Sequence, residues 1–299
     1  MPAKGGLSTT TDQTISRNTR PENPAGDDVA PVPTIPDPEP FQRQKHRHMP
    51  ISANIESFNH LDCIVISDNS ETPDLLVVLC HGFGAPGDDL ADFGPWLMQN
   101  SPQLRSRCRF VFPAAPLDLA HYGMPGARAW WPINMAMLAK LNETQDFSQL
   151  TAMTPPGMRD AAEQLHTAIS QMQQRWNVPN NRCIIGGFSQ GAMVTTCVTL
   201  RFQFQPALLA ILSGTLLEKN DWTHLAKSHP GCHVLQSHGT QDTILPITPA
   251  LELRELLQSS GFTVDFVQFN GPHTIPNNVL QRLQQQLETL IAESTHDGN

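Results

Sequence analysis

The stretch of residues 182–191 constrains the fold most, because it passes from strand to helix within a few residues. A short apolar run, 183–185, has the length and β-branching of a buried strand. It leads into 187–191, which matches the pattern G-x-S-x-G, and then into 192–198, a plausible start of a helix packed on that strand. In this strand–turn–helix context the pattern holds a serine Oγ at a sharp corner. Ser189 is therefore predicted to be a nucleophile, and a merely tight turn is the alternative.

Apolar runs alternate with helical patterns along most of the chain, which is typical of a parallel α/β sheet. The run Leu75–Cys80 is apolar throughout, as expected of a strand that is covered on both faces. We expect one α/β domain over residues 51–295, with a mostly parallel sheet of about seven strands and helices on both faces. Thr248 and Pro249 resemble the N-cap and the first residue of one helix. Predicted strands are 61–66, 75–80, 109–112, 183–188, 208–212, 233–237 and 264–269, and predicted helices are 88–99, 158–176, 191–202, 249–260 and 277–292.

Charge and cysteine usage exclude several classes of protein. The formal net charge of -9 argues against a nucleic-acid partner, which would need a basic face. The six cysteines lie far apart without a C-x-x-C pair, so neither a zinc site nor a redox pair is indicated. We expect buried free thiols in a reducing compartment. No apolar stretch has the length of a membrane span, and the N-terminus lacks a hydrophobic signal core, so a soluble cytoplasmic protein is expected.

Residues 1–50 differ from the rest of the chain in composition. They contain nine prolines and almost no aliphatic periodicity. Such a segment cannot bury enough apolar surface to offset the entropy of ordering it. The composition predicts a disordered tail, or a polyproline II segment.

The predicted nucleophile needs a base that is oriented by a third group. In strand–turn–helix hydrolases the chain order is serine, then an acid, then histidine. Asp242 follows the predicted strand 233–237 and His273 follows 264–269, so both lie at the edge where open α/β sheets place their sites. Asp221 is the rival acid, but its surroundings resemble a helix start. A turn-capping aspartate and an ordinary loop histidine are the alternatives for Asp242 and His273.

The loop after Leu75–Cys80 is the second part of this predicted site. The backbone N–H groups of Phe83 and Gln190 are predicted to bind the oxyanion. Residues 82–87 also match G-x-G-x-x-G, the dinucleotide fingerprint, so a nicotinamide-dependent oxidoreductase is the rival enzyme class. Pro86 removes an N–H from the phosphate-facing turn, and no acidic residue ends the next strand at the expected distance, which weakens that rival.

Five motifs in this order resemble the phospholipase/carboxylesterase family, which includes bacterial serine esterases and acyl-protein thioesterases. The motifs are 81–90, 113–116, 128–131, 187–191 and 238–242, and the resemblance covers roughly residues 60–292. It implies an α/β-hydrolase fold and cleavage of carboxylic esters, lysophospholipids or acyl thioesters. The departures are the tail, residues 132–157 and the proline directly before His273.

The resemblance also implies a Ser189–Asp242–His273 triad, with Phe83 and Gln190 as the oxyanion donors. It places Gly82 and Trp130 or Trp131 beside the substrate. It implies a small-molecule ester or acyl thioester as the partner and neither a metal nor an organic cofactor, and a homodimer is compatible with it. A hydrolase fold that binds a ligand or partner without turnover is the non-enzyme alternative.

Residues 132–157 interrupt the alternation of strands and helices and form a predicted insertion. Loops of that length inside a compact domain are usually functional or disordered. Five of the ten methionines fall between Met124 and Met158, and methionine is adaptable enough to line a site for varied apolar chains. We expect the insertion to cap the acyl pocket. A surface helix that fills its own core is the alternative.

Overall fold

The computed structural model describes residues 51–68, 72–134, 140–141, 143–144 and 146–294. The tail predicted for residues 1–50 lies outside this part of the chain. So does the middle of the predicted insertion, including Met135 and Met137. No helix among the described residues is long and apolar enough to cross a membrane.

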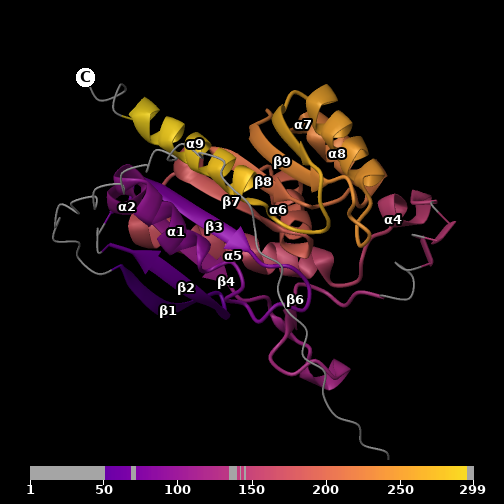
Figure 1. Cartoon of the computed structure of the whole chain (residues 1–299), viewed down its shortest axis with the longest axis horizontal. Helices are drawn as coiled ribbons and strands as arrows, with labels where there is room; N and C mark the ends of the chain where they lie inside the picture. The colour runs from indigo at the N-terminus through magenta and orange to yellow at the C-terminus, as the bar shows by residue number, and fades with distance from the viewer. Residues whose placement is uncertain (1–50, 69–71, 135–139, 142, 145, 295–299) are drawn as a thin grey trace, which may run out of the picture. The chain divides into compact units, whose positions relative to one another are not determined.

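An eight-stranded sheet forms the centre of the described chain, in the order β1-β2-β4-β3-β7-β8-β9-β10 (Figure 1). Strand β2 runs antiparallel to both of its neighbours, β1 and β4, and all other neighbouring pairs are parallel. The mostly parallel α/β-hydrolase sheet is therefore confirmed. The strands are β1 Ser52–Phe58, β2 Leu61–Ser67, β3 Leu75–Cys80, β4 Cys108–Pro113, β7 Cys183–Phe188, β8 Leu208–Leu212, β9 His233–Gly239 and β10 Thr263–Phe269, with a separate pair, β5 Leu117–Asp118 and β6 Arg128–Ala129.

Strand β1 is the one strand of this sheet that the sequence pattern did not predict. It lies at the edge and pairs only with β2. Most of its side chains are exposed, and Ile55 is 77% exposed. A strand without a buried face has no alternation to detect, because alternation reports the burial of one face.

Helices cover both faces of the sheet. Two apolar clusters form the core, and alternate residues of β3 belong to different ones. Leu76 and Val78 belong to the first cluster, and Leu75 and Val77 belong to the second. The first cluster includes residues of α5, α6, α7 and α8, and the second includes residues of α1, α2 and α9. The helices are α1 Phe93–Asn100, α2 Pro102–Arg107, α4 Ser148–Ala152, α5 Met158–Trp176, α6 Gln190–Arg201, α7 Lys219–Ser228, α8 Ile247–Ser259 and α9 Asn277–Ser294, with short 3-10 turns at Ala120–Tyr122 and Asn180–Arg182.

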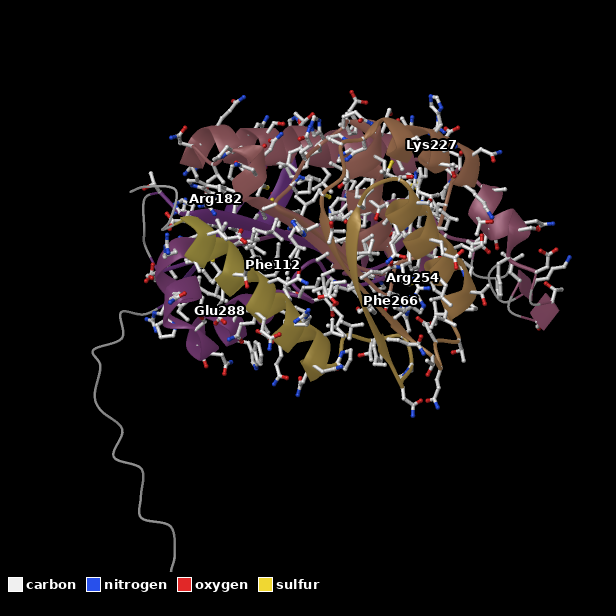
Figure 2. All side chains as sticks on the ribbon, turned by 90° about the horizontal axis from the view of Figure 1, so that it is seen from above. Phe112, Arg182, Lys227, Arg254, Phe266 and Glu288 are labelled. Carbon is white, nitrogen blue, oxygen red and sulfur yellow. The ribbon has the colours of Figure 1, made fainter. Side chains whose placement is uncertain are left out.

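The long helix α9 lies along one face of the sheet, above Phe112 of β4 (Figure 2). The guanidinium of Arg182 donates a hydrogen bond from Nη1 to the carbonyl of Leu290, 2.8 Å away. Apolar residues of α9, among them Leu283 and Leu287, pack into the same cluster as Phe112. The C-terminal helix is thus part of the core.

The predicted start of α8 was wrong. The helix begins at Ile247, after Pro246, and no side chain caps that end. Pro249 is the third residue of the helix, not the first. A proline fits there because the first N–H groups of a helix have no partner within it, so its missing donor costs nothing. The start of the predicted helix 88–99 was also wrong, in the opposite direction, because that helix begins only at Phe93.

Candidate active site

Ser189 lies at the corner between β7 and α6 with φ 54° and ψ −116°. Few residues other than glycine adopt positive φ, and such strain persists only where the surroundings enforce it. The Ser189 N–H donates to the carbonyl of Leu212 on β8 (2.9 Å), and its carbonyl accepts from the N–H of Met193 (3.2 Å). Sheet and helix thus hold the corner from both sides.

The two glycines of G-x-S-x-G allow β3 to approach this corner. A Cβ on Gly191 would lie 2.0 Å from the carbonyl oxygen of Cys80, and one on Gly187 would lie 2.3 Å from the same oxygen. No side chain can be accommodated at such distances without moving the backbone of β3. The two glycines of the motif are therefore needed for the packing of β3 against this corner, in addition to marking the predicted nucleophile.

We expect Gly191→Ala to lower the free energy of unfolding by about 3 kcal/mol or more, because the added methyl meets backbone that cannot move aside. Urea denaturation followed by circular dichroism measures this. The matched control is Gly94→Ala in α1, whose Cβ would meet only side chains, at 3.2 Å or more. An equal loss of stability in both variants would contradict the packing argument.

Asp242 and His273 are in direct contact. His273 Nδ1 lies 2.6 Å from Asp242 Oδ2, and the other carboxylate oxygen accepts the N–H groups of Ile244 (2.9 Å) and Leu245 (2.8 Å). Because a carboxylate accepts, Nδ1 carries the proton and Nε2 is left as the basic nitrogen. The rival acid, Asp221, lies on α7 and forms ion pairs with arginines instead.

His238 also approaches Asp242, and sequence reasoning assigned it no role. Its Nε2 lies 2.7 Å from the carbonyl of Leu245 and 3.4 Å from Asp242 Oδ2. Since a carbonyl only accepts, Nε2 carries the proton and donates it to Leu245. Burial lowers the pKa of His238, which keeps this second imidazole neutral. The hydrogen bond to Leu245 thus holds a neutral imidazole beside the carboxylate that contacts His273.

The loop that contains Phe83 lies against the serine corner. A Cβ on Gly82 would lie 3.4 Å from the Cβ of Ser189. The loop is tied to β6 by two backbone hydrogen bonds, from Gly84 N–H to the carbonyl of Arg128 and from Arg128 N–H to that of Ala85, both 2.9 Å long. Gln190 is the first residue of α6, where helix N–H groups have no partner within the helix.

His81 fixes the start of that loop from within. Its Nε2 accepts the N–H of Ala115 (3.0 Å), and its Nδ1 lies 2.7 Å from the carbonyl of Gly82. Accepting at Nε2 requires the neutral tautomer with its proton on Nδ1. Burial lowers the pKa of His81, in agreement with that tautomer.

The side chain of Gln190 joins the serine corner to the two tryptophans. Its Oε1 accepts the backbone N–H of Trp130 (2.9 Å), and its Nε2 donates to the backbone carbonyl of Trp131 (2.8 Å). The indole of Trp130 points inward and donates to the carbonyl of His81 (3.0 Å), whereas Trp131 lines the cavity beside Ser189. Sequence reasoning gave Gln190 a backbone role only, because the position of its amide depends on the fold.

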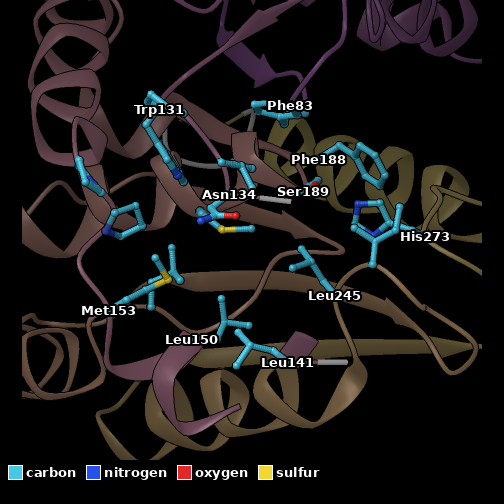
Figure 3. Close-up of a pocket in the computed structure, with 18 residues that line it drawn as sticks. Phe83, Trp131, Asn134, Leu141, Leu150, Met153, Phe188, Ser189, Leu245 and His273 are labelled. Atoms are coloured by element: carbon cyan, nitrogen blue, oxygen red, sulfur yellow. The ribbon is translucent and has the colours of Figure 1, made fainter. Parts of the chain in front are cut away.

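Ser189 and His273 line one largely apolar cavity of about 450 Å³, which Gly82, Phe83 and Trp131 also line (Figure 3). That volume is typical of small-molecule sites. Figure 3 shows Met153, Leu150 and Leu141 across the cavity from Ser189. Residues of the predicted insertion form much of this wall, namely Pro132, Ile133, Asn134, Leu141, Leu150, Met153, Pro155 and Pro156. The insertion therefore lines the cavity, as the hypothesis that it caps the pocket requires.

Comparison with known proteins shows what the sequence is similar to. A family described as Phospholipase/Carboxylesterase matches residues 61–291. Acyl-protein thioesterase 1 of Candida albicans is 27% identical over 210 residues, which cover 68% of this chain and 85% of that protein. Acyl-protein thioesterase 1 of Kluyveromyces lactis is 27% identical over 238 residues, covering 77% and 98%.

Solved structures share the fold. Esterase PE8 superposes with a TM-score of 0.62 at 22% identity, covering 80% of this chain and 99% of that one. Arabidopsis thaliana SOBER1 superposes with a TM-score of 0.56 at 18% identity, covering 73% and 99%. At such low identity these likenesses concern the fold alone.

Proposed function

The chain belongs to the phospholipase/carboxylesterase family and is a serine ester hydrolase, and from that premise we propose that Ser189, His273 and Asp242 act as its catalytic triad. One observation carries the proposal. The strained serine shares its cavity with a histidine whose Nδ1 is bound to a buried carboxylate. A serine needs both a base and a group that orients the base, and this arrangement offers them.

In the proposed mechanism, Ser189 Oγ attacks the acyl carbonyl carbon while His273 Nε2 takes the hydroxyl proton. Asp242 holds the imidazole in the Nδ1–H tautomer and stabilises the imidazolium. The N–H groups of Phe83 and Gln190 bind the oxyanion, each contributing about 3 kcal/mol in comparable sites. His273 then protonates the departing alkoxide or thiolate. Water, deprotonated by the same histidine, hydrolyses the acyl-enzyme and regenerates Ser189.

We propose that the substrate is an ester or thioester with an apolar acyl chain of medium or greater length. The cavity beside Ser189 is lined mainly by apolar side chains, among them Leu141, Leu150 and Met153. The fungal relatives named acyl-protein thioesterase are consistent with a thioester substrate. Burying each methylene contributes about 0.8 kcal/mol, which favours longer chains until the cavity is filled.

A series of p-nitrophenyl esters and matched acyl thioesters from C2 to C16 tests this substrate class. We expect kcat/KM to rise by up to about fourfold for each added methylene and then to level off. If kcat/KM were highest for the acetyl substrate and did not rise with chain length, the assignment of an acyl cavity would be contradicted. Comparing the two leaving groups at equal chain length then separates esterase from thioesterase activity.

The rival oxidoreductase has less support. The glycine loop 82–87 is packed against Ser189 at one end, and at the other a Cβ on Gly87 would lie 2.8 Å from that of Ala114. The following helix, α1, begins only at Phe93, so the loop does not open directly into a helix N-terminus that could receive a pyrophosphate.

A cytoplasmic location stays a prediction, supported by six free cysteines, five of them buried.

A further inference from the structure

Glu218 is a buried acid that contacts Met153, a residue across the cavity from Ser189 (Figure 3). It precedes α7 in the left-handed conformation, with φ 44° and ψ 42°, and its side chain is 1% exposed. A carboxylate that is so fully removed from water requires charged partners. Glu218 directly follows Leu217, which lines the cavity, so it lies next to the proposed acyl site.

Three side chains surround the Glu218 carboxylate. Oε1 accepts from Thr154 Oγ1 (2.9 Å) and Arg159 Nε (2.6 Å), and Oε2 accepts from Arg201 Nη2 (3.0 Å). Arg159 lies at the start of α5, and Arg201 is the last residue of α6, the helix that begins beside Ser189. The carboxylate thus joins the end of the insertion to two helices of the scaffold.

The backbone of Glu218 makes a further contact with the insertion. Its N–H donates to the carbonyl of Met153, 3.1 Å away. Met153 and the prolines at 155 and 156 all line the cavity. Thr154, which binds the carboxylate, lies between these lining residues. One residue of the scaffold therefore holds this part of the wall by both its backbone and its side chain.

Asp221 offers an internal comparison. It also pairs with Arg159 Nη2 (2.6 Å) and approaches Arg201 Nη2 (3.5 Å), but its side chain is 51% exposed. The Asp221 carboxylate pairs with these two arginines, and neither of them belongs to the insertion. Glu218 and Asp221 therefore share both arginines, whereas Glu218 alone of the two holds the segment 153–156.

We propose that Glu218 is a specificity-determining positioning residue, whose buried carboxylate fixes the 153–156 wall of the acyl cavity against Leu217. The inference rests on the proposed ester hydrolysis. Glu218 does not touch the reacting atoms. It sets which acyl chains fit by fixing apolar side chains that contact the far part of the chain. Short chains that do not reach this wall are unaffected by it.

The test is the ratio of kcat/KM for p-nitrophenyl decanoate to that for p-nitrophenyl acetate, which does not depend on the amount of folded enzyme. Glu218→Gln keeps the side-chain shape but turns amide N–H groups towards arginine N–H donors. We expect this ratio to change by about tenfold, the effect of misplacing roughly one methylene in an apolar pocket. The value of kcat/KM for acetate should stay within about threefold of wild type, since no group near Ser189 is altered.

Asp221→Asn is the matched control, and we expect it to leave the ratio within about twofold. Thr154→Val, which removes only the hydroxyl contact, should shift the ratio in the same direction as Glu218→Gln and by less. If Glu218→Gln does not fold, the ratio measured for Thr154→Val tests the inference instead. An unchanged ratio in the folded variant, including an equal loss for both esters, would overturn the inference. Failure of the proposed function looks different, because wild type would then lack Ser189-dependent hydrolysis of either ester.

Discussion

Ser189→Ala is expected to lower kcat for ester hydrolysis by about 10⁴-fold or more, because it removes the hydroxyl oxygen that is proposed to form the acyl-enzyme. The residual rate should reflect the oxyanion donors and binding alone. Stopped-flow or fixed-time assays with a medium-chain p-nitrophenyl ester measure it. Wild type should also react covalently with a fluorophosphonate probe, and the variant should not.

The matched control is Ser237→Ala, which removes another buried hydroxyl, on β9, two strands away from β7 and its corner. It should retain near-wild-type turnover and labelling. Full activity in Ser189→Ala would remove Ser189 from the mechanism. Wild-type protein that is folded but inert to both ester and probe would favour the non-catalytic binding protein instead.

Asp242→Asn is expected to lower kcat by about 10⁴-fold while the fold is retained. An amide accepts at one atom and donates at the other. The two N–H groups of Ile244 and Leu245 already require the acceptor, so the amide N–H₂ would face His273 Nδ1. His273 would then have to present a lone pair at Nδ1, which leaves the proton on Nε2 and removes the base.

The pH dependence of kcat/KM separates this effect from simple misfolding. In the variant, residual activity should rise with pH as hydroxide takes over the role of the base. Thermal unfolding should stay within a few degrees of wild type, as expected where shape and hydrogen-bond count are kept. Asp221→Asn serves as the comparison and should leave kcat unchanged. Comparable losses at positions 221 and 242 would contradict the assignment of the acid.

The sheet was predictable because most of its strands are buried on both faces. Leu75–Cys80 is apolar at every position, and all six residues are buried. The same rule could not find β1, whose faces are largely exposed, or the start of α8, where a proline fits inside the first turn. Apolar periodicity reports a buried face, so a strand such as β1, most of whose side chains are exposed, escapes it.

The residues of the proposed site also fall into two groups, those that the sequence predicts and those that it does not. Ser189, Asp242 and His273 follow from chain order and strand ends, which are local features of the sequence. The amide of Gln190, the second imidazole at His238 and the acid at Glu218 depend on contacts between residues distant in the chain. Nothing local distinguishes these polar residues from exposed ones, so only the folded structure assigns them partners.

The double use of Gln190 limits how the enzyme can change. One residue carries a proposed oxyanion donor on its backbone and a clamp for both tryptophans on its side chain. Any change that moves the backbone of Trp130 and Trp131 therefore also affects the corner at Ser189. In the part of the chain that the structure describes, the opposite wall lines the cavity without such a link to the corner; it is formed by Leu141, Leu150, Met153, Pro155 and Pro156. New substrate ranges, whether selected in evolution or in the laboratory, should arise first from substitutions in that wall.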